Sequence, residues 1–477
     1  MTQVTDDWDA IVVGGGVAGL VAARELATTG LRTVVLEAWA SPGGVVGRHE
    51  VDGLTLDAGA ESFATRGGAV ADLAGELGLT ARVVSPEPYG AWVRLSGGAG
   101  PLPRTGLLGI PAHPFAADVR RTIGWSGSLR AALDRLLPAA HGIRPEGEVT
   151  TLGDLVRARM GRRVLDRLVR PVVAGVHAAE PESIAADAVA PGLVASTRAE
   201  GALSLAVRAL RANAPAGSAV HSIEGGLHTL VDALVDDLRA HGGELRCEVP
   251  VTAVHRAAGA ARFRVEAGGR TLTALRLVVA TPHATDLLTD VAPELAGLHT
   301  DPGADIVLAT LVLDAPELDG HPRGTGVLVA KDVPEVTAKA LTHATAKWGW
   351  LARLAGPGRH VVRLSYGRAG EGAPAVPEDL DGLTDVALRD ASSILGVPLD
   401  RDRLRDSARV TWRQGLPVPS AAHRETVRRV RDAVSEVPGL AVVGAWVSGN
   451  GLASVVPDAR RVAAALAETP ASTRTNR

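Results

Sequence analysis

Three glycines near the start of the chain have the spacing of a phosphate-binding turn. Gly14, Gly16 and Gly19 lie between an apolar run, AIVV, and a stretch of helical periodicity, VAGLVAARELA. In this G-x-G-x-x-G pattern the first glycine permits a tight turn, the second lets a pyrophosphate approach the backbone, and the third lets helix pack on strand. The N–H groups at the start of the helix then face the phosphates. The pattern predicts a dinucleotide site whose residues are Gly14, Gly15, Gly16, Val17, Ala18 and Gly19.

An acidic residue closes the next apolar run. Glu37 ends the segment TVVLE and is followed by Ala38. A carboxylate at this point binds the ribose hydroxyls of the dinucleotide and repels a 2′-phosphate, which disfavours NADP. These residues alone do not distinguish FAD from NAD.

Composition limits the other classes of function. A chain of 477 residues predicts two or three domains, and its net charge of −3 argues against nucleic acid as the main partner. The single cysteine, Cys247, excludes an internal disulfide framework and a multi-cysteine metal site, and it suits the cytoplasm. We expect Cys247 to be a buried, small apolar residue. No metal site is expected.

Membrane attachment can also be judged from the sequence. The first residues, MTQVTDD, lack the basic start and apolar run of a signal peptide. No run approaches about 18 apolar residues, so no transmembrane segment is expected. Peripheral membrane contact through an apolar patch stays open.

A second glycine-rich segment carries a family resemblance. SPGGVVGRHEVDGLTLDAGAES, which ends at Ser62, resembles the second glycine signature of the flavin amine oxidase and protoporphyrinogen oxidase superfamily. The resemblance implies FAD as the cofactor. It implies that the double glycine lies near the FAD phosphates and that a later Gly-Ala pair lies near the isoalloxazine. The residues concerned are Gly43, Gly44, Val45, Gly59, Ala60, Glu61 and Ser62.

Three more positions follow from the same resemblance. VVGAWVSGNGL (442–452) resembles the C-terminal loop along the flavin, which implies contacts from Asn450, Gly451 and Leu452. Trp412 resembles a tryptophan that packs near FAD, and Val251 stands where relatives contact the adenine end through their backbone.

The resemblance narrows to the bacterial porphyrinogen oxidases. Five segments occur in the order found in enzymes of Gram-positive, particularly actinobacterial, haem synthesis: PLPRTGLLGIP, LVRPVVAGVHAAEPESI, KALTHATAKWGW, VTWRQGLPVPSAAH and GAWVSGNGLAS. The resemblance implies oxidation of coproporphyrinogen III to coproporphyrin III, with oxygen as acceptor and hydrogen peroxide as product. Protoporphyrinogen IX oxidase is the close alternative. A flavin amine oxidase and a non-catalytic porphyrin-binding flavoprotein rank behind it.

Substrate residues are harder to assign. Porphyrinogen propionates call for cationic anchors, and Arg pairs with a carboxylate through two parallel hydrogen bonds. Arg104 is the leading candidate and Arg66 the second, while His177 is a third residue that could touch substrate. No catalytic residue is expected, because the flavin performs the oxidation. A transient contact with the next haem-pathway enzyme is a further expectation.

Several positions depart from the family pattern. Val45 replaces the usual Lys or Arg after the double glycine, and Arg48 follows three residues later. His177 stands where Tyr is commoner, and Val418 where relatives often carry Gln. SGNG, with Asn450, replaces a more usual acidic-Gly-Val-Gly run. These departures bear more on substrate contacts than on FAD.

The expected fold class is α/β, with a Rossmann-type FAD-binding domain, a mixed α+β substrate domain and a helical insertion. The FAD domain is discontinuous, formed by residues 1–90, about 216–290 and 425–468. The insertion spans 95–210 and the substrate domain 291–424, while 469–477 form a disordered tail. The insertion has many arginines and no long apolar face, which favours a protein free of the membrane.

Overall fold

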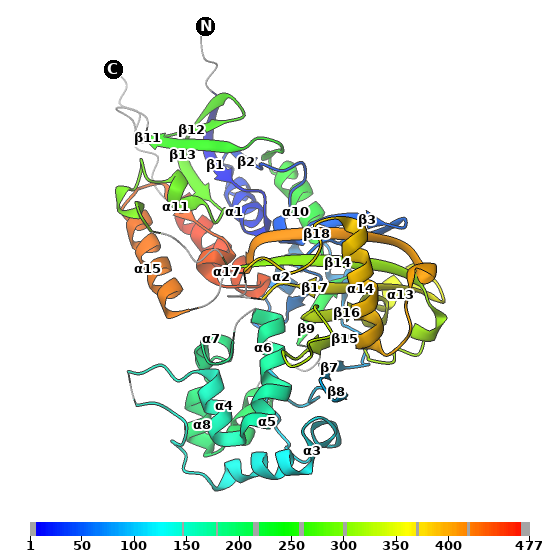
Figure 1. Ribbon diagram of the computed structural model, residues 1–477. Coiled ribbons are helices and arrows are strands. Elements are labelled where there is room, and N and C mark those ends of the chain that lie inside the picture. Colours follow the sequence, from blue (N-terminus) through cyan, green and yellow to red (C-terminus); the bar gives the residue numbers. More distant parts are fainter. Residues whose placement is uncertain are drawn as a thin grey trace, which may run out of the picture.

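The computed structural model describes residues 6–145, 147–177, 180–212, 219–256, 262–298, 303–368, 372–416 and 420–468. The tail 469–477 and Val418 therefore lie outside the described residues. Two seven-stranded sheets and a group of helices make up the molecule (Figure 1). None of the described helices is both long and apolar enough to span a bilayer.

The first sheet has the strand order β10-β2-β1-β13-β12-β11, with β19 paired to β13. Its strands are β1 (Asp6–Val13), β2 (Thr33–Leu36), β10 (Glu244–Arg246), β11 (Val251–Arg256), β12 (Phe263–Ala267), β13 (Arg270–Val279) and β19 (Leu440–Val442). Strands β10, β2, β1, β13 and β19 run parallel, whereas β11, β12 and β13 form an antiparallel meander. A mostly parallel sheet with covered faces is the expected Rossmann-type core.

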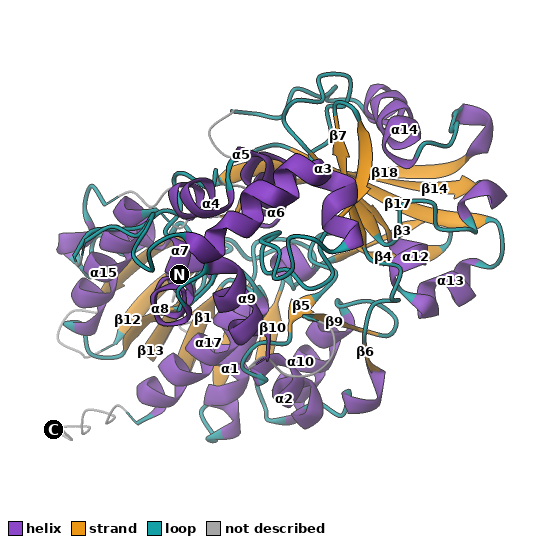
Figure 2. Ribbon diagram, turned by 90° about the horizontal axis from the view of Figure 1, so that it is seen from below, coloured by secondary structure: helices purple, strands orange, loops and turns teal. Residues whose placement is uncertain are grey.

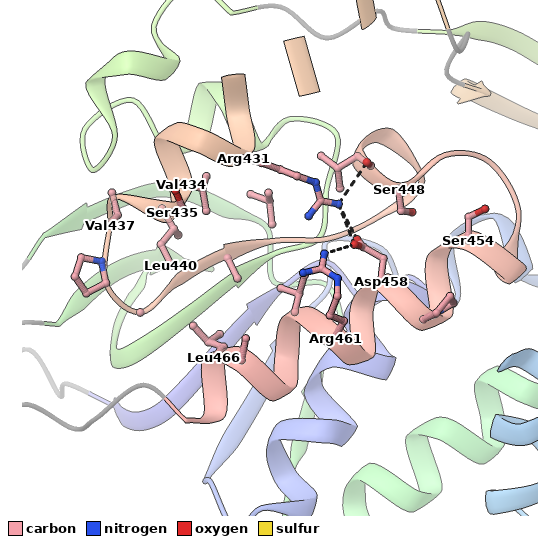
Figure 3. A pocket seen from close by; sticks show the side chains of 18 residues that line it. Arg431, Val434, Ser435, Val437, Leu440, Ser448, Ser454, Asp458, Arg461 and Leu466 are labelled. Carbon is pink, nitrogen blue, oxygen red and sulfur yellow. Dashed lines mark hydrogen bonds and ion pairs between the residues drawn. The ribbon is translucent and has the colours of Figure 1, made fainter. Parts of the chain in front are cut away.

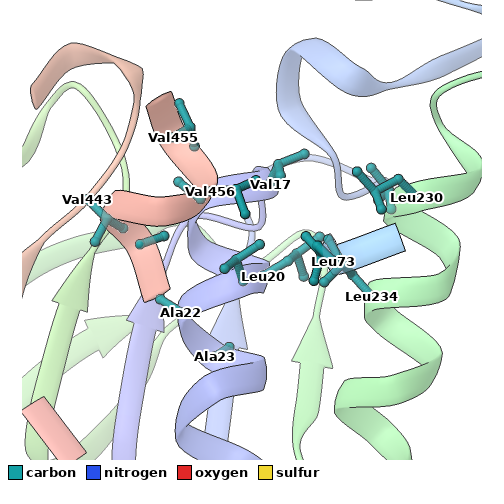
Figure 4. Close-up of a cluster of buried hydrophobic side chains, with 14 of the residues drawn as sticks. Val17, Leu20, Ala22, Ala23, Leu73, Leu230, Leu234, Val443, Val455 and Val456 are labelled. Atoms are coloured by element: carbon teal, nitrogen blue, oxygen red, sulfur yellow. The ribbon is translucent and has the colours of Figure 1, made fainter. Parts of the chain in front are cut away.

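Helices cover one face of this sheet and form its largest apolar cluster (Figure 4). They are α1 (Val17–Thr28), α2 (Ala69–Glu76), α10 (Thr229–Ala240) and α17 (Leu452–Ala467). Helix α1 is buried almost all round because it lies between the sheet and its neighbouring helices, and Leu20 meets Leu73 and Val456 in this layer. On the other face, α11 (Ala284–Leu287) and α15 (Ala421–Ser435) pack with the meander.

The second sheet has the order β18-β14-β17-β16-β15-β7-β8. Its strands are β7 (Ala91–Leu95), β8 (Gly98–Pro101), β14 (Ala304–Asp314), β15 (Gly326–Val329), β16 (Ala340–His343), β17 (Arg359–Tyr366) and β18 (Leu404–Leu416). Helix α14 (Leu380–Leu395) covers one face. The other face packs against α12 (Ala344–Lys347), α13 (Gly349–Ala355) and the hairpin of β3 (Arg48–Val51) and β4 (Leu54–Asp57).

A separate helical group extends below the two sheets in the view of Figure 1 and has its own apolar core. It comprises α3 (Ala117–Ala132), α4 (Leu152–Met160), α5 (Arg162–Val164), α6 (Arg170–His177), α7 (Ala186–Val189), α8 (Leu193–Glu200) and α9 (Leu203–Ala212). Seen from below, α3 crosses the face of the molecule nearest the viewer (Figure 2).

Two sequence expectations are wrong in this architecture. Cys247 is half-buried rather than buried, because it lies in the turn after the edge strand β10. The helical insertion does carry a long apolar face: Trp125, Leu129 and Leu133 on α3 and the turn after it are exposed. The sequence shows the spacing of these apolar residues but not that they face outward.

Candidate functional site

The turn after β1 has the shape that a bound pyrophosphate requires. Gly14 has φ +101°, a left-handed conformation. A Cβ atom at Gly19 would lie 2.0 Å from the carbonyl oxygen of Gly14, so no larger residue fits between helix and turn. Beyond its neighbours in the chain, no atom of the described residues lies within 4 Å of a Cβ placed on Gly16, which leaves the backbone there open to a ligand.

Two uncapped helix N-termini lie at the same edge of the sheet. Strands β1 and β19 both run parallel to β13. Helix α1 follows β1 directly, and α17 follows β19 after the short helix α16 (Ala445–Ser448), with its first residue, Leu452, in the same apolar cluster as Val17 of α1. Each begins after a glycine, Gly16 or Gly451, without a side-chain cap and without an acidic residue in its first turn. Free N–H groups and the helix dipole favour anions at this edge.

Glu37 follows β2 at that edge and is 6% exposed. Its Oε2 accepts a hydrogen bond from Gly15 N at 2.6 Å, and its Oε1 accepts one from Trp39 N at 2.9 Å. A carboxylate has about four acceptor positions, so it can still receive ribose hydroxyls. Val249 N donates to the carbonyl of Glu37 at 2.9 Å, which brings the chain just before Val251 beside Glu37. Ala38 is exposed.

The second glycine segment joins the first through the backbone. Gly43 N donates to the carbonyl of Gly15 at 2.8 Å. Ala60 N donates to the carbonyl of Val45 at 2.7 Å, and a Cβ atom at Gly59 would lie 2.1 Å from that same oxygen. These two segments, which the sequence assigns to FAD, therefore form one continuous backbone surface from the pyrophosphate turn to the loop 57–62.

The second sheet holds the loop 57–62 in place. Trp412 of β18 donates from Nε1 to the carbonyl of Ala58 at 3.0 Å, and Arg363 of β17 donates to the carbonyl of Asp57 at 3.0 Å. Trp412 thus contacts the loop that the sequence assigns to the flavin. The second sheet fixes the segment predicted to face the isoalloxazine.

A buried charge cluster completes this attachment. Lys347 Nζ lies 2.6 Å from Glu61 Oε1, and Arg363 lies 3.2 Å from Glu61 Oε2. The three side chains are 12–18% exposed. Burial alone would raise the pKa of Glu61, but Lys347 and Arg363 outweigh it and hold that pKa below its usual value. Glu61 is therefore an ionised carboxylate shared between two cations.

Lys347 and Arg363 were missed at the sequence level. A lysine inside the apolar stretch ATAKWGW is a usable signal, because a lysine is rarely buried without a partner. Arg363 gives no comparable signal, since an alternating strand such as HVVRLSY accommodates an arginine on a solvent face.

The C-terminal loop adds glycine turns beside α17. Gly449 and Gly451 have φ +90° and +92°, and Leu452 is buried as the first residue of α17. Asn450, which lies between the two glycines, is partly exposed. Arg66, from the end of the flavin-side loop, reaches Ser454 Oγ in the first turn of α17 at 3.5 Å.

The other two predicted substrate residues, Arg104 and His177, lie in the segments that lead into and form the helical group. Arg104 is exposed, and its backbone N–H donates to Asp118 at 2.9 Å. His177 is the last residue of α6, and its side chain lies outside the described part of the structure. Helix α6 itself packs closely on the second sheet, since a Cβ atom at Gly175 would lie 2.6 Å from a methyl group of Leu328.

A cavity of about 850 Å³ lies elsewhere, between α15, β19 and α17 (Figure 3). Arg431 and Arg461 both bind Asp458 at its wall. Its lining includes Ser448 and Ser454 but none of the residues assigned to FAD or substrate. This cavity borders the C-terminal loop at Ser448 and Ser454 and is not the predicted FAD or substrate site.

Comparison with known proteins agrees with this geometry. The family model of flavin-containing amine oxidoreductases matches residues 17–467. The coproporphyrinogen III oxidase of Mycobacterium tuberculosis (strain ATCC 25618 / H37Rv) is 30% identical over 96% of this chain and 97% of its own. The chloroplastic protoporphyrinogen oxidase of Oryza sativa subsp. japonica is 25% identical, over 96% and 88%.

A solved structure is similar over almost the whole chain. It is a provisionally named protoporphyrinogen oxidase from Exiguobacterium sp. 255-15, with a TM-score of 0.81, 27% identity and coverage of 98% of this chain and 99% of that one. Open glycine turns, uncapped helix N-termini and Glu37 fit FAD in the same fold. The chain therefore belongs to the family of flavin-containing amine oxidoreductases and is an FAD-dependent oxidoreductase.

Proposed function

We propose that the protein oxidises coproporphyrinogen III to coproporphyrin III in haem biosynthesis, using oxygen and releasing hydrogen peroxide. The observation that carries this proposal is the end-to-end similarity to relatives named coproporphyrinogen III oxidase, at 30% identity over 96% of the chain. Such a match includes both sheets and the helical group, and so extends beyond the cofactor site.

The cofactor and the protein chain contribute different parts of the proposed reaction. A porphyrinogen becomes a porphyrin by losing six electrons and six protons, and three oxygen molecules accept them as three hydrogen peroxide molecules. Bound FAD supplies the two-electron oxidations, while the protein supplies binding, orientation and electrostatics. The loop 57–62 would fix the flavin against the second sheet, through the contacts of Glu61 and Trp412. The protons that leave the pyrrole nitrogens would pass to water.

The substrate carboxylates require cationic partners. Arg66 lies beside α17, which begins at the carboxyl edge of the first sheet, and Arg104 is free to bind a propionate at the border of the helical group. Both guanidinium groups can form paired hydrogen bonds with a carboxylate. We assign Arg104 and Arg66 to propionate binding, and His177 to the shape of the substrate pocket.

Protoporphyrinogen IX is the alternative substrate, because the rice relative and the Exiguobacterium structure carry that name. The two porphyrinogens differ in whether two ring substituents are propionates or vinyl groups. An amine oxidase fits less well, since the aromatic cage expected for a neutral amine would have to come from 2 Tyr, 3 Phe and 8 Trp. Within the cell we place the enzyme in the cytoplasm, in transient contact with the enzyme that takes its porphyrin product.

The decisive experiment compares both porphyrinogens on the purified holoenzyme, with oxygen uptake and peroxide release measured together. We expect faster turnover of coproporphyrinogen III. Arg104→Gln should raise KM for coproporphyrinogen more than for protoporphyrinogen, whereas Arg239→Gln, an exposed arginine on α10, should change neither. Faster turnover of protoporphyrinogen IX would overturn the substrate assignment, and a colourless protein would overturn the FAD-dependent reaction itself.

A further inference from the structure

The cavity of about 850 Å³ lies along an open edge of the first sheet (Figure 3). Among the described residues, β19 pairs with β13 alone, so the other edge of β19 carries no strand. Helix α15 packs in the apolar cluster on one face of the sheet, and α17 packs in the cluster on the opposite face. Both helices and β19 line the cavity, which is therefore a space between two helix layers.

An ion-pair cluster at the wall joins the two helices (Figure 3). Arg431 of α15 donates to both carboxylate oxygens of Asp458 of α17, at 3.0 and 2.9 Å. Arg461 of α17 donates to the same carboxylate at 2.6 Å. These three are the ionisable side chains among the lining residues, and one carboxylate faces two guanidinium groups. The wall therefore has an excess of one positive charge.

Both arginines keep donors for a further anion. A guanidinium has five N–H donors. Arg431 uses Nη2 for Asp458 and for the carbonyl of Val447, and Arg461 uses Nη2 for Asp458. Within the described part of the chain, Nε and Nη1 of these two side chains make no hydrogen bond. Arg461 is also 65% exposed, so an incoming ligand can reach it.

The rest of the lining is mainly apolar. Its larger apolar side chains come from α15, β19, α17 and the segments between them: Val434, Val437, Leu440, Val447, Val462 and Leu466. Binding sites for small molecules are typically apolar cavities of about 300–1,000 Å³ with a few convergent polar groups. The volume and the single charged wall of this cavity both agree with that description.

Two serines connect the cavity with the C-terminal loop. Ser448 and Ser454 line the cavity, and they flank the loop residues 449–451. Ser454 Oγ accepts the hydrogen bond from Arg66 at 3.5 Å. A ligand in the cavity would lie against both ends of this loop without occupying the predicted FAD or substrate site.

We propose that this cavity binds a single-chain amphiphile with a terminal carboxylate, a free fatty acid in chemical class. The carboxylate pairs with Arg461 and Arg431, and the alkyl chain lies against the valines of the other walls. One ligand charge matches the one excess positive charge. Coproporphyrin, with four carboxylates, would leave most of its charges without partners here. This proposal rests on neither the substrate nor FAD.

Isothermal titration of the full-length holoprotein with laurate, below its micelle concentration, tests the proposal. We expect saturable binding that added salt weakens. Acetate lacks the chain and dodecyltrimethylammonium lacks the anion, so neither should bind comparably. Arg461→Gln should weaken laurate binding by about tenfold, because it removes charge-assisted hydrogen bonds. Arg428→Gln, on α15 outside the lining and 64% exposed, is the matched control and should bind as the wild type does.

A second variant tests the apolar part of the cavity. Val462→Glu places a negative charge beside the alkyl chain and should weaken binding by more than tenfold. Thermal melting without laurate verifies that each variant is folded. Arg461 is mostly exposed, so Arg461→Gln keeps the test decisive even where Val462→Glu does not fold.

Four results would overturn the proposal. Wild-type protein could give no heat of binding with laurate, or it could bind dodecyltrimethylammonium as tightly. Arg461→Gln could bind laurate as the wild type does. Tighter binding of dodecyl phosphate than of laurate would contradict the match to a single negative charge. Light scattering could instead show a dimer that Val462→Glu converts to a monomer, which would assign the cavity to a second copy of the chain.

Discussion

Replacing Glu61 by glutamine tests how the flavin-side loop is held. In the folded protein one carboxylate faces two cations, Lys347 at 2.6 Å and Arg363 at 3.2 Å. Glu61→Gln keeps the size of the side chain and removes its charge. Lys347 and Arg363, 18% and 14% exposed, would then face each other without an anion.

The expected magnitudes follow from burial and charge. Removing one partner of a buried ion pair costs about 3–5 kcal/mol, and the partial exposure of this cluster places Glu61→Gln near the lower end of that range. Lys347→Met leaves the contact between Glu61 and Arg363 intact, so it should cost about 1.5–2 kcal/mol, the lower part of the range for one hydrogen bond to a charged group. The double variant should cost less than the sum of the two, because Lys347 matters only while Glu61 is charged.

Thermal melting with and without added FAD measures both stability and cofactor retention. We expect Glu61→Gln to lower the melting temperature by roughly 3 °C, since a chain of 477 residues has an unfolding entropy of about 1 kcal/mol/K. It should also release FAD more readily, because Glu61 follows the Gly59–Ala60 pair. Arg401→Gln, which breaks an exposed pair with Asp385, should melt as the wild type does. Equal effects of Glu61→Gln and Lys347→Met, or a strictly additive double variant, would refute this reasoning.

Three further predictions concern the cofactor turn, the second sheet and the helical group. Gly19→Ala should weaken FAD binding by about tenfold or more, measured by flavin absorbance after gel filtration, because its Cβ would lie 2.0 Å from the carbonyl of Gly14. Burial and two neighbouring histidines lower the pKa of His343 to about 3. Between about pH 6.5 and that value, His343 is therefore protonated in the unfolded chain but not in the folded protein. Stability should fall by up to about 1.4 kcal/mol per pH unit from there towards pH 3, and His343→Gln should flatten that profile in urea titrations. Arg159→Met should cost about 3–5 kcal/mol by leaving Asp134 buried and unpaired, with FAD content unchanged.

The cofactor half of the fold was predictable because local backbone requirements create it. Gly14 needs a left-handed φ and Gly19 needs close contact with the turn, so each glycine leaves a mark in the sequence at a fixed spacing. Alternating or continuous apolar runs likewise indicated β1, β14 and β17, and the structure confirms them as strands. Such signals depend on neighbours within a few residues.

Contacts between residues that are far apart in the chain leave no comparable pattern in the sequence. Glu61 meets Lys347 286 residues later, and no period or motif links the two positions. The exposed apolar face of α3 was missed for a related reason. Its apolar spacing is visible in the sequence, but which side faces inward depends on the pairing of Asp134 with Arg159 from another helix.

The positions that depart from the family pattern differ in whether their backbone or their side chain makes the contact. Val45 contributes its carbonyl oxygen to Ala60 N, and the loop around Asn450 turns on the glycines beside it. Backbone groups are the same in every residue, so we expect substitutions there to leave the backbone hydrogen bonds of the predicted FAD surface intact. Substrate contacts depend on side chains, and His177 is the departure placed at the end of a helix that packs on the second sheet. Differences in substrate preference should therefore follow the side chain at 177 rather than those at 45 and 450, and His177→Tyr should shift the ratio of the two porphyrinogen rates without changing FAD content.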